Sequence, residues 1–251
     1  MFLKNNIKQL LKYALYCFYR LNKTNTVSVL CYHEISSVNN SETSIIPSVF
    51  EEHIIRLKKN GKKFVTLDAI VKYIKAGKKD LAQSIIAITF DDGYIDNFTN
   101  MFPIITKYKI PVTVFINGYN INKKGFLGKN EISDMRESKL VSFEYHGLTH
   151  KMLDACSDYE LSIELDNSTI GYNYFAYPGG HRNKKIIYQV KAFGYYAAFS
   201  IAPDLITVKS NLYDIPRSVV TRDMKQWEVL MRTSVSQKIY RKIVRLIKYY
   251  V

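Results

Sequence analysis

Short runs rich in β-branched and aromatic residues recur along the chain and predict strands. They cover residues 27–33, 63–67, 85–90, 111–116, 140–145, 174–177, 196–200 and 214–220. Between several of these runs, apolar residues return at helical spacing. Within residues 48–62, for example, Phe50, His53 and Leu57 share one face. A helix is therefore predicted there, and Gly61 ends it.

Two further helical patterns continue the alternation of strands and helices. Residues 94–109 are interrupted by Pro103, which can start a second short helix, and residues 184–194 close on Gly194. Strands that alternate with helices predict a mainly parallel sheet. About eight strands in such a sheet predict an α/β fold, namely an irregular (β/α) barrel of seven or eight strands that is similar to a TIM barrel.

Polar residues gather where the predicted strands end. A predicted strand ends at or directly before each of His33, Asp91, Asp92, His146 and Pro178. In barrels of parallel strands, these carboxyl ends form the face on which catalytic residues meet. The pattern therefore predicts that these residues belong to one site.

Composition indicates a globular protein whose charge is concentrated at its two ends. The 251 residues are 47% apolar and 14% aromatic, without a linker, repeat or low-complexity tract, which predicts one domain. Of the net charge of +14, residues 1–23 contribute +5 and residues 232–251 contribute +6, both without an acidic residue. Only +3 remains for residues 24–231. We therefore divide the chain into that domain and two basic amphipathic terminal helices.

Basic amphipathic helices are typical of proteins that bind anionic membranes, although terminal helices packed on the domain explain the pattern equally well. The uncharged stretch 13–19 is too short to span a bilayer, and a signal-peptide pattern is not evident. We expect a peripheral membrane protein on the cytoplasmic face, with a secreted or periplasmic location left open. Nucleic acid is not expected as a partner, because the central domain lacks a basic stripe or a known binding motif.

Two adjacent carboxylates, Asp91 and Asp92, follow the apolar run 85–90. Like charges repel, and one carboxylate would take up a proton unless a cation or hydrogen-bond donors stabilised both. Adjacent side chains at a strand end point in different directions, so one can bind a metal while the other faces a reacting water. Gly93 permits a sharp turn behind them. The alternative is an Asp that caps a helix starting near Tyr94.

A pair of histidines adds a second signal. His146 and His150 are four residues apart, so on a helical turn both rings would lie on one face. Two histidines and one aspartate form a three-ligand set for a divalent metal that leaves positions open for water and substrate. Two polar histidines on a loop are the alternative, but the combination with the paired aspartates favours a metal site.

These motifs resemble those of the polysaccharide deacetylase family, carbohydrate esterases with a NodB-homology domain. The segment TFDDGY (89–94) is similar to the first family motif, and HGLTH (146–150) is similar to the H-[ST]-x-x-H motif, with Gly147 in place of Ser or Thr. The segments CYHEI, PVTVFI and FAYPGG agree as well. The resemblance covers residues 27–220 and is nearest to the poly-N-acetylglucosamine deacetylase-like branch.

The resemblance implies a role for each matching residue. Asp91 is the implied general base, and Asp92, His146 and His150 are the implied ligands of a divalent metal, Zn²⁺ with Co²⁺ or Ni²⁺ as alternatives. Such a metal lowers the pKa of bound water and polarises the amide carbonyl, while a nearby carboxylate removes the proton of the water.

The third family motif is present in part. The turn Tyr177, Pro178 and Gly179 is the candidate oxyanion and substrate site, with the backbone N–H of Gly179 as donor. The family commonly has an Arg that supports the base two residues before the Pro, where this chain has Ala176. Arg217 is our candidate for that support, and a surface Arg at a strand end is the alternative.

The late Leu-x-His motif, whose His serves as general acid, is missing, since no His follows His181. His33 resembles the histidine used by a circularly permuted branch of the family, and we expect it across the ring of strand ends from Asp91. A packed strand histidine is the alternative. His53 is expected in the core, His181 on a solvated loop, and Cys31 as a packing residue on the side of His33.

The expected function is that of a metal-dependent hydrolase that removes N-acetyl groups from amino sugars of a polysaccharide or a lipid-linked saccharide. A deformylase or O-deacetylase on the same site is the nearest alternative. A catalytically silent sugar-binding protein at the membrane surface and a basic membrane adaptor are the others.

Overall fold

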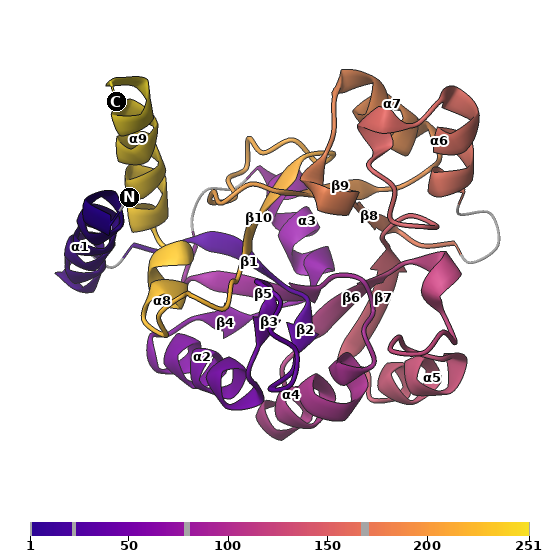
Figure 1. Ribbon diagram of the computed structural model, residues 1–251, viewed down its shortest axis with the longest axis horizontal. Helices are drawn as coiled ribbons and strands as arrows, with labels where there is room; N and C mark the ends of the chain where they lie inside the picture. The colour runs from indigo at the N-terminus through magenta and orange to yellow at the C-terminus, as the bar shows by residue number, and fades with distance from the viewer. Residues whose placement is uncertain (1, 22–23, 78–80, 167–170, 251) are drawn as a thin grey trace.

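Seven parallel strands close into a barrel in the computed structural model, which describes residues 2–21, 24–77, 81–166 and 171–250 (Figure 1). The ring runs β1, β10, β9, β8, β7, β6 and β5, and closes because β5 pairs with β1. The bounds are β1 Val27–Tyr32, β4 Lys63–Phe64, β5 Ile85–Phe90, β6 Val112–Ile116, β7 Val141–Tyr145, β8 Tyr174–Ala176, β9 Ala197–Ile201 and β10 Ile215–Val219. The one predicted strand that is not part of the ring is β4, which pairs only with the start of β5. The predicted irregular α/β barrel is confirmed.

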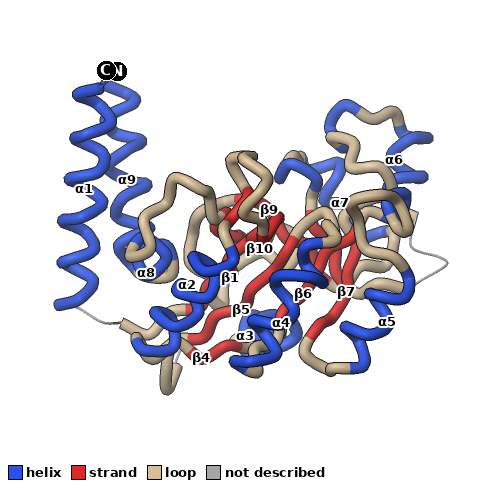
Figure 2. The backbone as a smooth tube through the Cα atoms, turned by 60° about the horizontal axis from the view of Figure 1, so that its bottom comes forward, coloured by secondary structure: helices blue, strands red, loops and turns tan. Residues whose placement is uncertain are grey.

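Helices surround the barrel and fill most of the connections (Figures 1 and 2). Their bounds are α2 Pro47–Lys59, α3 Leu67–Ala76, α4 Phe102–Tyr108, α5 Lys129–Glu137, α6 Asp158–Leu165, α7 Lys184–Ala192 and α8 Glu228–Arg232. A π-helical turn, Asn97–Met101, precedes α4, and Pro103 lies in the first turn of α4, as predicted. A short parallel pair, β2 Glu34–Ile35 and β3 Ser44–Ile45, follows β1.

The core has two layers because strand residues alternate between the two faces of the barrel wall. The inner cluster contains Val29, Ala87, Phe115 and Phe199, and α3 packs against it. The outer cluster lies between the strands and the helices α2, α4, α5, α6 and α7. Polar residues on the inner row at the carboxyl ends of the strands are therefore held by a rigid wall.

The two terminal helices, α1 Phe2–Leu21 and α9 Val235–Tyr250, pack on one another and stand at the edge of the molecule (Figure 2). The boundary expected after residue 23 falls next to residues 22–23, which lie outside the described residues. The side chains of residues 2–9 and 245–250 lie outside the described part as well. The division into 1–23, 24–231 and 232–251 stays a prediction. In the part of the chain that the structure describes, no helix has the length and apolar content needed to cross a bilayer.

Candidate metal centre and catalytic base

The first part of the site is the pair of carboxylates that follows β5. Ala87 packs in the inner cluster, and the alternation of side chains brings Asp91, four residues later, to the same face, where it is fully buried. Asp92 breaks the alternation with a φ of 74° and stays partly exposed. Gly93 follows with a φ of 71°, and a Cβ there would lie 2.8 Å from Cγ2 of Ile116. Only glycine fits this turn, which separates the two carboxylates.

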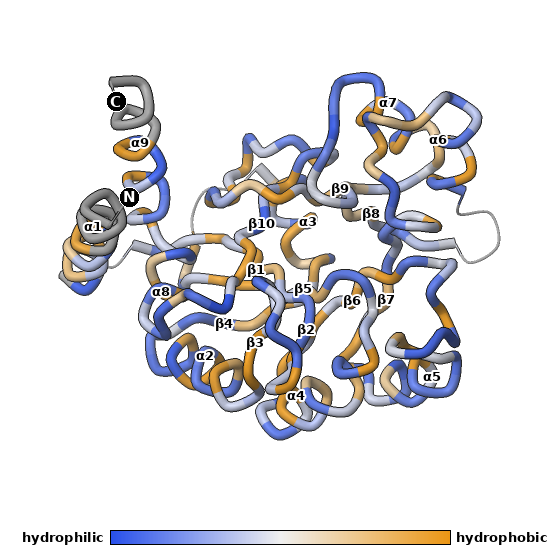
Figure 3. Tube along the Cα trace, in the orientation of Figure 1, coloured by the Kyte–Doolittle hydropathy of each residue, from blue (hydrophilic) through white to orange (hydrophobic). Residues whose placement is uncertain are grey.

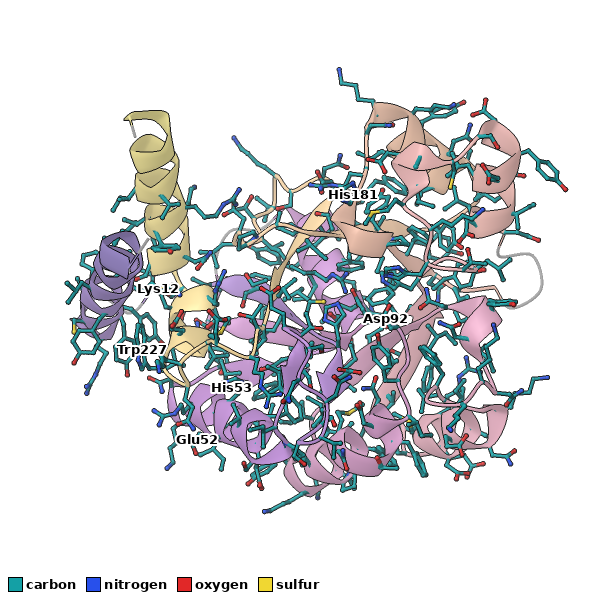
Figure 4. The ribbon with its side chains drawn as sticks, in the orientation of Figure 1. Lys12, Glu52, His53, Asp92, His181 and Trp227 are labelled. Carbon is teal, nitrogen blue, oxygen red and sulfur yellow. The ribbon has the colours of Figure 1, made fainter. Side chains whose placement is uncertain are left out.

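The three predicted metal ligands lie together near the centre of the barrel (Figure 4, Asp92). Nε2 of His146 is 3.6 Å and Nε2 of His150 is 3.4 Å from Oδ1 of Asp92. Nδ1 of His146 lies 2.8 Å from the carbonyl oxygen of Ala176. Because a carbonyl only accepts hydrogen bonds, Nδ1 carries the proton and Nε2 keeps its lone pair for a metal. Burial lowers the pKa of His146, which favours the same neutral form.

The segment that carries both histidines is a loop, so the helical turn considered from the spacing is not formed. His150 has a φ of 65°, yet the two imidazole centroids are 5.0 Å apart. The carboxylate of Glu164, on α6, accepts hydrogen bonds from the backbone N–H and the hydroxyl of Thr149. Gly147 has a φ of 80°, and a Cβ there would lie 3.1 Å from Oε2 of Glu164. The left-handed backbone and this close carboxylate explain the glycine at a position where the family has Ser or Thr.

Replacing Glu164 by Gln is expected to weaken metal binding by about 10–100-fold, the range typical of groups that orient metal ligands. The two donors of Thr149 reach different oxygens of the Glu164 carboxylate, and Gln has an NH₂ group, which cannot accept, in place of one of them. Competition with a chromophoric chelator measures the affinity. Glu160→Gln is the matched control on the same helix, because a Gln can keep the capping box with Ser157. Equal affinities of the two variants would remove Glu164 from this role.

The predicted partner of the base, Arg217 on β10, contacts Asp91 through both carboxylate oxygens. Nη1 donates to Oδ1 at 2.6 Å and Nη2 donates to Oδ2 at 2.7 Å, and both side chains are fully buried. Nη1 also donates to the hydroxyl of Thr89 at 3.1 Å, and the guanidinium lies over the ring of Phe115. Ala176 belongs to the same inner cluster as Phe115. Arg217 on β10 therefore supplies the guanidinium that the family commonly has at the position of Ala176.

This contact keeps Asp91 ionised. Burial alone would raise its pKa, but Arg217 lowers it, and the resulting pKa lies well below the usual range. The Sγ of Cys31 is 3.3 Å from Oδ2 of Asp91. Burial raises the pKa of this thiol well above its ordinary value, so it stays protonated and donates to the carboxylate. The adjacent carboxylates are therefore compatible because Asp91 is neutralised by Arg217 while Asp92 faces the histidines.

His33 lies beside Asp91, not across the ring from it as we expected. The reason is that β1 pairs with β5 along its whole length, so the residues that follow the two strands are neighbours. One ring nitrogen of His33 is within 4.8 Å of both the Asp91 carboxylate and Sγ of Cys31. Nδ1 of His33 is buried and has no hydrogen-bond partner among the described residues. Its role as general acid stays a prediction.

The turn after β8 lies against the loop that carries His146 and His150. A Cβ added to Gly147 in that loop would lie 3.6 Å from Cγ of Pro178. Gly179 has a φ of 60°, and its backbone N–H has no acceptor among the described residues, which leaves it available for an oxyanion. Tyr177 differs from our expectation. Its side chain is fully buried and its hydroxyl donates to the carbonyl oxygen of Tyr213 at 2.8 Å, so it supports the turn and does not contact a substrate.

The remaining histidines behave as expected, and one supporting residue was missed. His53 is buried, with its ring 3.1 Å from the hydroxyl of Tyr32. His181 is half-exposed and pairs with Asp154 at 3.0 Å. Asn117 was not predicted, although it directly follows β6 as the other site residues follow their strands. Its side chain donates to the carbonyl oxygen of His146 at 2.7 Å, which fixes the start of the histidine loop.

Sequence and fold are both similar to known proteins. The sequence pattern of the polysaccharide deacetylase family matches residues 78–198. A poly-β-1,6-N-acetyl-D-glucosamine N-deacetylase from Staphylococcus aureus (strain MRSA252) is 30% identical over 239 aligned positions, 84% of this chain and 81% of the relative.

Two solved structures have a similar fold. Streptococcus pyogenes deacetylase PplD in complex with acetate has a TM-score of 0.75 and 18% identity, over 83% of this chain and 98% of its own. IcaB from Ammonifex degensii has a TM-score of 0.70 and 22% identity, over 84% of this chain and 98% of its own. At these identities the likeness concerns the fold alone.

Proposed function

Because this chain belongs to the polysaccharide deacetylase family, a family of hydrolases, we propose that it removes N-acetyl groups from amino sugars of a glycan. The observation that carries the proposal is the arrangement of two kinds of carboxylate at one place. Asp91 is buried and held ionised by Arg217, while Asp92 faces two imidazole nitrogens that can bind a metal. A base for water and a ligand set for a cation thus lie side by side.

Each residue then has one task in amide hydrolysis. When bound to Asp92, His146 and His150, a divalent metal would polarise the acetyl carbonyl and lower the pKa of water. Asp91 accepts a proton from the attacking water, whose oxygen bonds to the carbonyl carbon. His33 donates a proton to the sugar nitrogen as the C–N bond breaks. The products are acetate and a free amino sugar.

Backbone and guanidinium groups prepare the site before substrate arrives. Arg217 fixes both oxygens of Asp91, so the carboxylate does not rotate away from the water that it must deprotonate. The N–H of Gly179, which has no acceptor among the described residues, is the donor for the negative charge that develops on the carbonyl oxygen. Donors that are already in place need no reorganisation during the reaction, which is the main source of electrostatic catalysis.

We propose an N-acetylglucosamine polymer as substrate, and a lipid-linked saccharide as its alternative form. The support is the name of the Staphylococcus relative, which acts on poly-β-1,6-N-acetyl-D-glucosamine. Zn²⁺ is the proposed metal because two imidazoles and one carboxylate are typical of its catalytic sites, and Co²⁺ and Ni²⁺ accept the same donors.

Metal removal and replacement test this function. The purified full chain, treated with a chelator, is expected to stop releasing acetate from β-1,6-linked N-acetylglucosamine oligomers and to recover when Zn²⁺ is returned. Replacing His146 or His150 by Ala should strip the metal and abolish hydrolysis. Release of formate, or of acetate from O-acetyl sugars only, would instead favour the sister activities. A protein that binds the oligomers and a metal but releases nothing would be a silent sugar-binding protein.

A further inference from the structure

We propose that α1 and α9 form a surface that docks on anionic lipid bilayers. The two helices lie side by side at the edge of the molecule, and α8 links them to the barrel (Figures 1 and 2). One side of α1 is buried through Leu15 and Tyr19. The opposite side carries Leu10, which is 70% exposed, Tyr13, which is 56% exposed, and the exposed Cys17. Their spacing of three and four residues places them in one stripe.

The stripe belongs to a helix that is firmly attached to the rest of the protein. Nζ of Lys12 lies 2.7 Å from Oε2 of the buried Glu228 on α8. The rings of Tyr16 and Trp227 are 5.1 Å apart, and Ser236 of α9 donates to the carbonyl oxygen of Leu15 at 2.8 Å. The exposed apolar side chains are therefore presented at a fixed place by a packed pair of helices.

Exposed basic residues on the same two helices match the charge of an anionic bilayer. Lys12 pairs with Glu228 as described, and Arg241 pairs with Asp204 at 2.8 Å. Arg20, Lys238 and Lys242 are exposed, and no ion pair involves them within the described residues. Hydrophobic and hydrophilic residues alternate along α9 (Figure 3). An apolar stripe with flanking cations is the pattern of helices that lie at the boundary of headgroups and acyl chains.

The charge and the apolar stripe also argue against two other partners for this face, namely a second copy of the chain and nucleic acid. Residues 1–23 and 232–251 together carry +11 without an acidic residue. A second copy of the chain docked through the same face would bring an equal positive charge against it, which is unfavourable. Nucleic acid would satisfy the charge but leave Leu10 without an apolar partner. Anionic lipid satisfies both the charge and the stripe.

Docking through this face leaves the catalytic site open. Lys12 and Trp227 lie at one edge of the molecule, whereas Asp92 lies near the centre of the barrel (Figure 4). Changes on the outer faces of α1 and α9 should therefore alter membrane binding without altering hydrolysis of a soluble oligomer. This separates the present inference from the proposed activity, because either can fail while the other holds.

Vesicle flotation of the full chain tests the charge. We expect it to float with vesicles of phosphatidylcholine and phosphatidylglycerol but not with phosphatidylcholine alone, and less well as salt rises. Each basic residue near such a surface contributes about 1 kcal/mol, so Lys238→Gln with Lys242→Gln should weaken partition by about 30-fold. The matched control, Lys72→Gln with Lys75→Gln on the exposed side of α3, removes the same charge and should change partition by less than about twofold.

A fluorophore on Cys17 tests the stripe itself. The Cys156→Ser variant removes a partly exposed thiol, and Cys31 is buried. The label should therefore react with the exposed Cys17. A polarity-sensitive label should shift its emission to shorter wavelengths when anionic vesicles are added, and Leu10→Ser should weaken the partition. Binding without a shift, or equal losses in the α3 control, would overturn the proposal. A shift without vesicles that grows with protein concentration would assign the face to a second copy of the chain.

Discussion

Replacing Asp91 by Asn is expected to lower kcat for acetate release by about 10²–10⁴-fold while the protein keeps its metal. The amide nearly preserves the shape of the side chain but cannot accept the proton of the attacking water. The metal should remain because its proposed ligands are Asp92 and the two histidines. Turnover on an N-acetylglucosamine oligomer and metal content by atomic absorption measure the two effects. Retained turnover would remove Asp91 from its role as base, and loss of the metal would make it a ligand.

The same substitution should also destabilise the fold, because it leaves the guanidinium of Arg217 buried without its anion. Breaking one side of a buried ion pair costs about 3–5 kcal/mol. Denaturant unfolding is expected to show this loss for Asp91→Asn and for Arg217→Met. The double variant should recover most of the stability, because no charge is left unpaired, yet it should stay inactive. Additive losses of stability in the double variant would mean that the two side chains do not depend on one another.

Strand alternation made much of the fold and the site predictable. The runs of β-branched residues marked every strand of the ring, because each crosses a wall that is buried on both faces. The same alternation, continued past the strand ends, placed Asp91 and His146 on the inside. The gathering of the proposed metal ligands was predictable because Asp92 is the second residue after β5, while His146 and His150 are the first and fifth residues after β7, and parallel strands end on one face.

The ring order was less predictable, and this changed the position of His33. Residues 63–67 resemble a full strand, but β4 has only two residues and meets only the start of β5. The ring therefore closes directly between β1 and β5. Had β4 been inserted between them, His33 would stand one strand farther from Asp91. Pairing across 58 residues of chain is a property of the closed barrel and not of any local pattern.

Contacts between side chains and residues that are distant in the sequence could not be predicted either. Glu164 follows Thr149 by 15 residues on a separate helix, and no spacing rule connects them. Arg217 was only a candidate, since its contact with Asp91 spans 126 residues and depends on both side chains facing the inside of the barrel. Tyr177 was misassigned because a residue beside a functional turn can face the outer core, where its hydroxyl meets Tyr213.

Replacing His33 by Ala is expected to lower kcat on an N-acetyl substrate by about 10²–10⁴-fold, because an amide cannot break unless its nitrogen is protonated. The ring lies at the carboxyl end of β1, within 4.8 Å of the Asp91 carboxylate, and its buried Nδ1 is free of hydrogen bonds within the described residues. It is thus placed to donate a proton as the C–N bond breaks.

The leaving group of the substrate decides whether His33 acts as an acid or only supports the structure. An ester releases an alkoxide, which is less basic than an amide anion, so hydrolysis of an O-acetyl substrate should suffer less from His33→Ala than N-acetyl hydrolysis does. Loss of packing would instead slow both substrates equally, since it would disturb Asp91 and its water in either reaction. Metal content and the denaturant midpoint should stay close to those of the unmodified chain. If N-acetyl hydrolysis is unchanged, the proton must come from Asp91 or from water, and His33 is a packing residue beside the base.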